Sequence, residues 1–374
     1  MHEGARTSFG PLLLGGSSAA LGFGAWAVGG TGWGDPGDEQ ERLAAVRVAL
    51  EHGVTFFDTA PTYGAGASER LLGAVLKPVR DQVIIATKVG PRDDPRRSLE
   101  QSLRRLDCDY VDLVQLHEAL ERWEWQIEKL HRLVEDGKAR ALGLCNATAR
   151  QIARAMEIAP LASYQGPYNL FDRDVEQREL PLLREHGLAF LAYRPLAAGL
   201  LAGTYDDLPA FGARDHRAGI YWFKGREFAR RHSVIARLRP LAEQLRLTLP
   251  ALALRWLLAR PGVTVVLAGA RNASQVEENL AAQAGALPAD IVGAVDEIVA
   301  AAFELPRALP RALREAETWG PRERFIVERL DGGSAHTAEA IAAEWTDRGE
   351  QPMVAAQVKL FADRLEEGGL AHAP

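Results

Sequence analysis

The feature that most constrains the fold of this 374-residue chain is a local pattern that recurs eight times. Each copy is a short apolar or β-branched run, a polar loop, and a stretch with apolar residues three and four positions apart, which predicts a strand followed by a helix. The predicted strands cover residues 18–24, 54–58, 83–88, 110–116, 140–144, 162–165, 189–194 and 263–269. Eight such units predict a parallel sheet closed into a (β/α)8 TIM barrel, an α/β fold.

The stretches between the strands predict helices over residues 39–53, 68–77, 96–106, 123–137, 148–158 and 174–187, with a last group over 234–246 and 249–260. Several of them close with a glycine at or just past the last turn, where a left-handed backbone costs that residue little. An open doubly wound sheet is the competing arrangement. The closed barrel is favoured because the sequence carries no GxxxxGK[ST] phosphate loop of the kind that open sheets often use.

Composition limits the functions open to the chain. It is 47% hydrophobic and 25% charged with a formal net charge of −6, so no nucleic-acid partner is expected. Two cysteines, Cys108 and Cys145, form neither a disulfide framework nor a thiolate metal site, which predicts a reducing compartment and places any redox chemistry on a bound cofactor. The apolar N-terminal stretch predicts a core strand rather than a secretory signal, because glycines interrupt it. We expect a cytoplasmic protein without a membrane-spanning helix.

Unusual polar residues follow three successive predicted strands. The second strand ends at Asp58 with Tyr63 in its loop, the third ends at Lys88, and the fourth runs into His117. In a TIM barrel the chemistry sits on these loops. A lysine at the end of a buried strand is costly unless an acid lies near, and Asp58 is one strand away. Each residue also has a structural interpretation: Asp58 and Lys88 as a plain ion pair, Tyr63 as loop packing, and His117 as a core histidine.

These residue types suit one kind of chemistry. A tyrosine hydroxyl, with a pKa of about 10, is a poor proton donor at neutral pH, but a neighbouring cation stabilises the phenolate and lowers that pKa. Lys88 can supply the charge, Asp58 can hold the ammonium, and His117 can donate a hydrogen bond to a substrate oxygen or relay a proton. The set predicts a reaction that places negative charge on a carbonyl oxygen and then protonates it, as hydride addition does. Acyl transfer is not expected, since no nucleophile elbow accompanies the set.

Five dispersed stretches, over about residues 6–300, resemble the aldo-keto reductase family. FFDTAPTYGAGASERLLGAVL is similar to the family signature at the second strand and its helix, IIATKVG to that at the third strand, and DLVQLH to that at the fourth. AYRPLAAGLLAGTY resembles the family segment at the seventh strand, and PGVTVVLAGARNASQVEENL resembles the cofactor-binding segment around the eighth. The chain departs from the family after His117, where it reads HEALERWEW in place of the usual proline and acid.

The resemblance implies a catalytic tetrad of Asp58, Tyr63, Lys88 and His117, with Tyr63 as the general acid, and it implies NADPH (NADP+) bound extended across the barrel mouth. No metal is expected. The implied cofactor-binding residues are Asn146 and Gln165 at the carboxamide, Tyr193 on the nicotinamide ring, Leu196, Gly199 and Leu200 at the phosphates, and Arg271, Gln275, Glu278 and Asn279 at the adenosine end. NADPH is preferred over NADH because Arg271 stands just before a predicted helix start, where an anion is favoured.

The predicted substrate is a small molecule with a carbonyl group, and several residues are candidates for contacting it. Trp26, Trp33, Trp123 and Trp125 are candidates for the substrate wall. The segment over residues 204–231, rich in charge and aromatics, is either a lid or a solvated loop. Arg194 and Arg214 are candidates for binding an acidic or phosphorylated substrate.

Residues 307–374 predict a part separate from the barrel of residues 1–306. A proline- and charge-rich linker leads into three short amphipathic helices, and this pattern resembles the winged-helix modules that recognise leader peptides. DNA binding is not expected, because the last helical stretch, QVKLFADRLEEGG, is not basic. Docking of a peptide or protein partner and a helical appendage that packs on the barrel or dimerises both remain open.

The predicted function is that of an enzyme, an NADP-dependent oxidoreductase that reduces an aldehyde or ketone. The alternative is a binding protein on the same scaffold, because reductase-like barrels also resemble the cytoplasmic subunits of potassium channels. Such a protein would bind the cofactor as a sensor, with slow turnover or none, and could dock its partner through residues 307–374.

Overall fold

The computed structural model describes residues 20–35 and 37–303. Its strands are β1 (Ala20–Gly24), β2 (Phe56–Asp58), β3 (Ile84–Val89), β4 (Val111–Leu116), β5 (Ala139–Cys145), β6 (Ser163–Pro167), β7 (Ala189–Tyr193) and β8 (Val263–Ala268). Its α-helices are α2 (Glu39–Glu51), α3 (Ala67–Leu76), α4 (Pro95–Leu106), α5 (Trp123–Glu135), α6 (Ala149–Ile158), α7 (Glu179–His186), α8 (Gly225–Gln244), α9 (Leu249–Leu258), α10 (Ala273–Leu280) and α11 (Ala289–Phe303). None of these described helices is long and apolar enough to cross a membrane.

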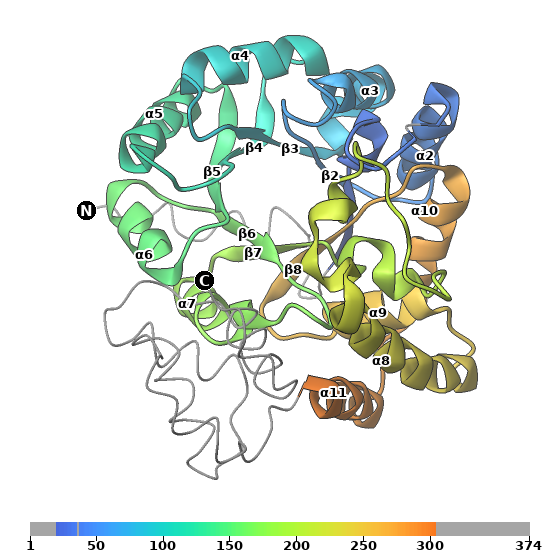
Figure 1. Ribbon diagram of the computed structural model, residues 1–374. Helices are drawn as coiled ribbons and strands as arrows, with labels where there is room; N and C mark the ends of the chain where they lie inside the picture. The colour runs from blue at the N-terminus through green and yellow to red at the C-terminus, as the bar shows by residue number, and fades with distance from the viewer. Residues whose placement is uncertain (1–19, 36, 304–374) are drawn as a thin grey trace. The chain divides into compact units, whose positions relative to one another are not determined.

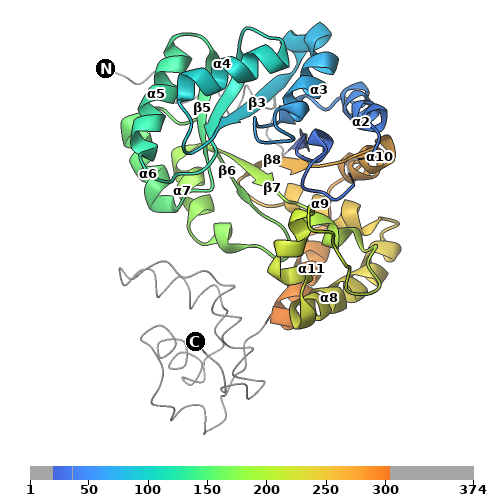
Figure 2. The ribbon, with the colours of Figure 1, turned by 45° about the horizontal axis from the view of Figure 1, so that its top comes forward.

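The eight strands form one closed barrel. They lie in chain order, each pairs in parallel with the next, and β1 closes the ring by pairing with β8. Figure 1 shows helices α3 to α7 running around the outside of the strands, and Figure 2 shows the same ring tilted. Helix α2 lies beside α10, which brings the first and last strand–helix units together. The predicted TIM barrel is therefore confirmed, with all eight of its strands.

The barrel interior separates into an apolar layer and a polar layer. Because side chains alternate along a strand, residues two positions apart share an orientation. Phe56, Ala86, Leu113, Ala141, Ala189, Leu191, Val265 and Leu267 form one buried apolar cluster. Two positions further along β2, β3 and β4 stand Asp58, Lys88 and Gln115, all buried. The apolar cluster therefore supports a polar layer at the carboxyl ends of the strands.

Two helices start more than two residues away from their predicted first residue. The stretch predicted as one helix over residues 174–187 begins with a 3-10 turn, and α7 starts only at Glu179. This start places Pro181 in the first turn, where its missing N–H leaves no helical hydrogen bond unmade. Helix α8 starts at Gly225 rather than at residue 234, because Phe228 continues its buried face. The candidate lid is consequently a loop only as far as residue 224.

The chain divides into two compact units, residues 1–293 and 294–374, and of the second only residues 294–303, the end of α11, are described. The predicted linker and winged-helix-like module, residues 307–374, lie outside the described residues. They stay predictions, as does the domain boundary after residue 306.

Candidate active site

A cavity of about 850 Å³ opens at the carboxyl ends of the strands. Its lining includes twelve of the predicted site residues: Asp58, Tyr63, His117, Asn146, Gln165, Tyr193, Leu196, Gly199, Arg271, Gln275, Glu278 and Asn279. The other two, Lys88 and Leu200, have buried side chains. The barrel thus gathers around one cavity residues that lie near the carboxyl ends of β2, β6 and β7 or follow β2, β4, β5, β7 and β8.

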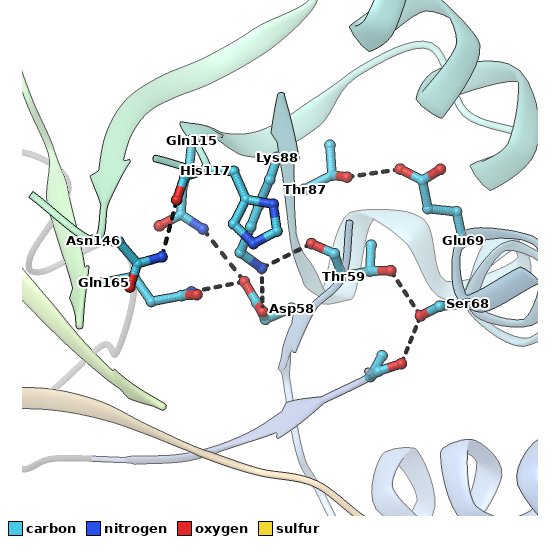
Figure 3. Close-up of polar contacts among 11 residues, drawn as sticks. Asp58, Thr59, Ser68, Glu69, Thr87, Lys88, Gln115, His117, Asn146 and Gln165 are labelled. Carbon is cyan, nitrogen blue, oxygen red and sulfur yellow. Dashed lines mark hydrogen bonds and ion pairs between the residues drawn. The ribbon is translucent and has the colours of Figure 1, made fainter. Parts of the chain in front are cut away.

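The Lys88 ammonium lies in the polar layer, fully shielded from solvent. Its Nζ donates hydrogen bonds to Asp58 Oδ1 at 2.5 Å and to the Thr59 carbonyl oxygen at 2.9 Å, as Figure 3 shows. It also lies 5.0 Å from the centroid of the Tyr63 ring. Burial lowers the pKa of Lys88, but Asp58 and Tyr63 raise it by more, so the net pKa lies above its usual value. Lys88 therefore carries a positive charge inside the barrel.

Asp58 is also held by two buried glutamines. Gln165 Nε2 donates to Asp58 Oδ2 at 2.9 Å, and Gln115 Nε2 donates to the same oxygen at 3.3 Å (Figure 3). Gln165 was predicted at the carboxamide of the cofactor, and this stays a prediction; it lines the cavity, and its amide nitrogen faces the carboxylate. Gln115 was missed, although the alternation of side chains along β4 shows it, since it stands two residues before His117. The carboxylate is thus fixed on both oxygens.

A close contact between two loops positions Tyr63. The next residue, Gly64, has φ 61°, and a Cβ there would lie 1.9 Å from the Gly29 carbonyl oxygen. Only glycine fits at this position, so the loop after β2 lies directly against the turn that follows β1. Ser68 Oγ, at the start of α3, ties the same two segments by donating to the Ala25 carbonyl oxygen at 2.7 Å.

Burial sets the protonation states of the two residues that face the cavity. Desolvation raises the pKa of Tyr63 to about 12, although Lys88 acts to lower it. Lys88 therefore acts on Tyr63 as predicted, but the expected net decrease in the pKa of Tyr63 is wrong, because the effect of burial is larger than that of the lysine. Desolvation and the Lys88 charge lower the pKa of His117 to about 3. Near neutral pH the phenol is protonated and the imidazole is neutral, and the two ring centroids are 6.0 Å apart.

The Asn146 amide joins two walls of the cavity. Its Nδ2 donates to the His117 carbonyl oxygen at 3.0 Å, and its Oδ1 accepts a hydrogen bond from the Tyr193 hydroxyl at 2.8 Å. Its φ of 50° lies in the left-handed region, which asparagine tolerates better than most residues. Asn146 therefore fixes the Tyr193 ring relative to the backbone that carries His117.

The predicted phosphate-binding segment follows β7. Leu196 precedes the 3-10 segment Ala197–Ala202, in which Gly199 has φ 91°. The space beside Gly199 is open, because a Cβ there would meet only the Tyr205 hydroxyl, at 3.8 Å. Leu196 and Gly199 line the cavity, whereas the Leu200 side chain points into the core. The segment Ala197–Ala202 therefore offers open backbone at Gly199 and no charged side chain to a ligand.

Arg271 stands just before α10 at the far end of the cavity. Asn272 caps this helix by accepting a hydrogen bond from the Gln275 backbone N–H at 3.0 Å, and Gln275 Oε1 accepts one from the Arg271 backbone N–H at 2.9 Å. Arg271 Nη1 donates to the carbonyl oxygens of Trp33 and Asp35 at 3.3 and 3.4 Å. These acceptors are uncharged, and no carboxylate of residues 20–35 or 37–303 forms an ion pair with the Arg271 guanidinium.

The loop between β7 and α8 meets the loop after β1 at the cavity. The backbone of Asp215 bridges to that of Trp33, and the His216 ring lies 4.4 Å from Trp26 and 4.2 Å from Trp33, between ring centroids. Arg217 pairs with the buried Asp215 at 2.6 Å. The predicted wall residues Trp26 and Trp33 do line the cavity, whereas the role of His216 was missed, since its signal is only one polar residue in a charged loop.

Three predicted contact residues lie away from the cavity. Among the described residues that line it, neither Trp123 nor Trp125 occurs, and both belong to α5. The Trp125 ring instead lies 4.7 Å from the Arg122 guanidinium. Arg214 is exposed and is also absent from that lining. The structure gives no support for a substrate role of these three residues, because aromatic and basic composition alone does not show which way a side chain points.

The model of the aldo/keto reductase family matches residues 20–300. The chain belongs to this family. Membership indicates an oxidoreductase that uses a nicotinamide cofactor. The match covers the barrel and stops before residues 307–374.

Relatives of known name support the same assignment. The chain is 36% identical over 277 residues to the aldo-keto reductase YhdN of Bacillus subtilis. This alignment covers 70% of this chain and 83% of that protein. It is 32% identical over 300 residues to the NADH-specific methylglyoxal reductase of Escherichia coli, covering 70% and 89% of the two chains.

Solved structures agree with these relatives. The glycerol dehydrogenase of Gluconobacter oxydans superposes with a TM-score of 0.70 at 32% identity, covering 77% of this chain and 94% of that one. An aldo-keto reductase of Klebsiella pneumoniae in complex with NADPH superposes with a TM-score of 0.61 at 28% identity, covering 75% and 90%.

Proposed function

We propose that this aldo/keto reductase uses NADPH to reduce the carbonyl group of an aldehyde or ketone, with Tyr63 as the general acid. One observation carries the proposal: a charged Lys88, shielded from solvent, lies between Asp58 and the Tyr63 ring. A fixed cation in a site without water stabilises negative charge that develops beside it. The Tyr63 oxygen is where such charge would form after proton donation.

The residues around the cavity fit a dinucleotide cofactor. Tyr193 offers a ring fixed by Asn146 at one end, Gly199 leaves open space beside its backbone, and Arg271 places a cation at the start of α10. NADPH bound there would supply hydride from C4 of the nicotinamide to the carbonyl carbon. The Klebsiella neighbour binds NADPH and the Escherichia coli relative is NADH-specific, so our preference for NADPH rests on Arg271.

The side chains of this site account for the proton. As the carbonyl carbon gains a hydrogen with its electron pair, the Tyr63 hydroxyl gives its proton to the carbonyl oxygen and an alcohol results. The Lys88 ammonium, held by Asp58, stabilises the phenolate that remains. Neutral His117 donates a hydrogen bond to the same carbonyl oxygen and orients it toward Tyr63. Solvent returns the proton to the phenolate after the product leaves.

A Tyr63→Phe substitution tests this role. Loss of a general acid lowers turnover by about 10²–10⁴-fold, whereas nucleotide binding should change less than about twofold. NADPH binding can be followed by tryptophan fluorescence, because Trp26 and Trp33 line the cavity. Tyr110→Phe is the matched control, since Tyr110 precedes β4, away from the carboxyl ends of the strands.

The outcomes separate the enzyme from a sensor. Turnover in Tyr63→Phe equal to that of the wild type, across a set of aldehydes and ketones, would refute the catalytic role. Tight NADPH binding with no turnover of any carbonyl by the wild type would favour a cofactor-binding sensor on the same barrel.

The cofactor preference has its own test, in the dissociation constants of NADPH and NADH for Arg271→Ala. We expect weaker binding of NADPH by about tenfold or more and little change for NADH, because the lost guanidinium would face the 2′-phosphate. Arg150→Ala, at an exposed position on α6, controls for the loss of one positive charge. Equal weakening of both nucleotides would remove the reason to prefer NADPH.

A further inference from the structure

Three arginines line the cavity, and their partners differ. Arg217 pairs with Asp215, and Arg271 donates to backbone carbonyls. Within residues 20–35 and 37–303, no carboxylate or other oxygen accepts a hydrogen bond from the Arg194 guanidinium, and its Nε is buried without a partner. A desolvated donor without an acceptor is costly, so a ligand that supplied one would bind there with advantage.

The backbone of Arg194 is held rigidly. Its φ of 55° lies in the left-handed region, where an arginine bears strain that a glycine would not. Its carbonyl oxygen accepts hydrogen bonds from the buried Asn169 side chain at 3.1 Å and from the Ala197 backbone N–H at 2.9 Å. These contacts fix the backbone from which the Arg194 side chain extends, beside the Tyr193 ring.

Two neighbours locate the guanidinium. It lies 5.4 Å from the centroid of the Tyr193 ring, the ring proposed to face the nicotinamide. Burial lowers the pKa of His216, and the Arg194 charge lowers it further, so the charge also acts at His216. His216 packs on Trp26, and Trp26 stacks on Tyr63 with ring centroids 5.8 Å apart. Arg194 therefore lines the same cavity as Tyr63, beside the Tyr193 ring and close enough to His216 for its charge to act there.

We propose that Arg194 binds an anionic group of the substrate, so that the enzyme acts on carbonyl compounds that carry a carboxylate or phosphate. The inference rests on the carbonyl reduction proposed above. A guanidinium binds such groups through two parallel hydrogen bonds, which a neutral substrate could not offer. The phosphates of the cofactor are a second source of anion, but Arg194 adjoins Tyr193 at the proposed nicotinamide end.

The test compares two aldehydes of equal chain length, succinic semialdehyde and butyraldehyde, with Arg194→Met and with Arg214→Met as the control at an exposed position of the same loop. Arg194→Met should lower kcat/KM for succinic semialdehyde by about tenfold to a hundredfold, mainly through KM, and for butyraldehyde by less than about twofold. Arg214→Met should change neither. Arg194→Lys, which keeps the charge but not the paired donors, should fall between the wild type and Arg194→Met.

A binding measurement separates failure of this inference from failure of the proposed function. The dissociation constant of succinate for the NADP+-saturated protein, followed by tryptophan fluorescence, should rise about tenfold in Arg194→Met and stay unchanged in Arg214→Met. An unchanged succinate constant in Arg194→Met overturns the inference, whether or not aldehydes are turned over. A weaker NADPH complex with unchanged succinate binding overturns it too, and assigns Arg194 to a cofactor phosphate.

Discussion

Asp58→Asn tests the buried ion pair most directly, because it keeps the size of the side chain and removes its charge. The side chains of Lys88 and Asp58 are 0% and 5% exposed, so water cannot replace the lost carboxylate. Removing one partner of a buried pair costs about 3–5 kcal/mol of unfolding free energy. The new amide nitrogen would also face Lys88, Gln115 or Gln165, all of which now donate to Asp58.

Urea unfolding followed by far-UV circular dichroism measures this cost. Asp58→Asn and Lys88→Met should each lose about 3–5 kcal/mol, since each leaves one group without its counter-ion. The double variant should lose about 2–3 kcal/mol less than the sum of the two, because it leaves no unpaired charge. Losses that add to within about 0.5 kcal/mol would refute the argument, since they would show that the two groups are not coupled.

The dependence of these losses on pH is a second check on Lys88. In the wild type its pKa is raised above the unfolded value of about 10.4, so the stabilisation is complete below that pH and is lost as the pH rises through the folded pKa. In Asp58→Asn, burial without an anion lowers the pKa, so the variant loses stability as the pH falls below about 10.4. The deficit of the variant should therefore shrink between about pH 7 and pH 10. A constant deficit would mean that Lys88 keeps its charge without Asp58.

Three further changes test other parts of the site. Gly64→Ala would put a Cβ 1.9 Å from a backbone oxygen and should abolish turnover. Gly53→Ala, at φ 82° with nothing within 4 Å, should cost only about 1 kcal/mol of unfolding free energy. Equal losses of stability and turnover in the two variants would contradict this reasoning. Burial lowers the pKa of His117 to about 3. As the pH falls from about 6 to about 4, the unfolding free energy of the wild type should therefore fall more steeply than that of His117→Gln, by up to about 1.4 kcal/mol per pH unit. Parallel curves for the two proteins would contradict this prediction. Asp215→Asn removes the partner of Arg217, so trypsin should cut the loop between β7 and α8 faster, and an unchanged cleavage rate would show that this pair does not hold the loop.

The sequence predicted most of the barrel because the spacing of apolar residues within each strand–helix unit can be recognised from neighbouring residues alone. Eight apolar runs, each followed by a helical pattern, leave few other ways to bury the sheet. The same logic placed Asp58, Lys88 and His117 at one end of the barrel, since the carboxyl ends of parallel strands meet there. Their mutual contacts follow from strand order, and the ion pair joins two neighbouring strands.

The parts that sequence reasoning missed depend on three-dimensional contacts between loops. Gln115 could have been found from strand alternation, but Gln165 turns toward Asp58 only because the barrel interior brings β6 within reach of β2. The His216 ring packs on Trp26 and Trp33 because Asp215 forms a backbone bridge between two loops far apart in the chain. The net pKa of Tyr63 also depends on how deeply the closed barrel buries it, which residue types do not reveal.

Burial explains why this group of residues would give up a proton only to a substrate. Asp58 is negative and Lys88 positive, while Tyr63 and His117 are neutral, so the buried cluster has no net charge. Loss of a proton from Tyr63 to solvent would leave a net negative charge in a desolvated site, and the raised pKa of Tyr63 expresses that cost. When hydride addition makes a carbonyl oxygen negative, the charge is already inside the cavity, and proton transfer only moves it onto the phenol oxygen beside Lys88. Desolvation therefore opposes loss of the Tyr63 proton to solvent without opposing its transfer to the substrate.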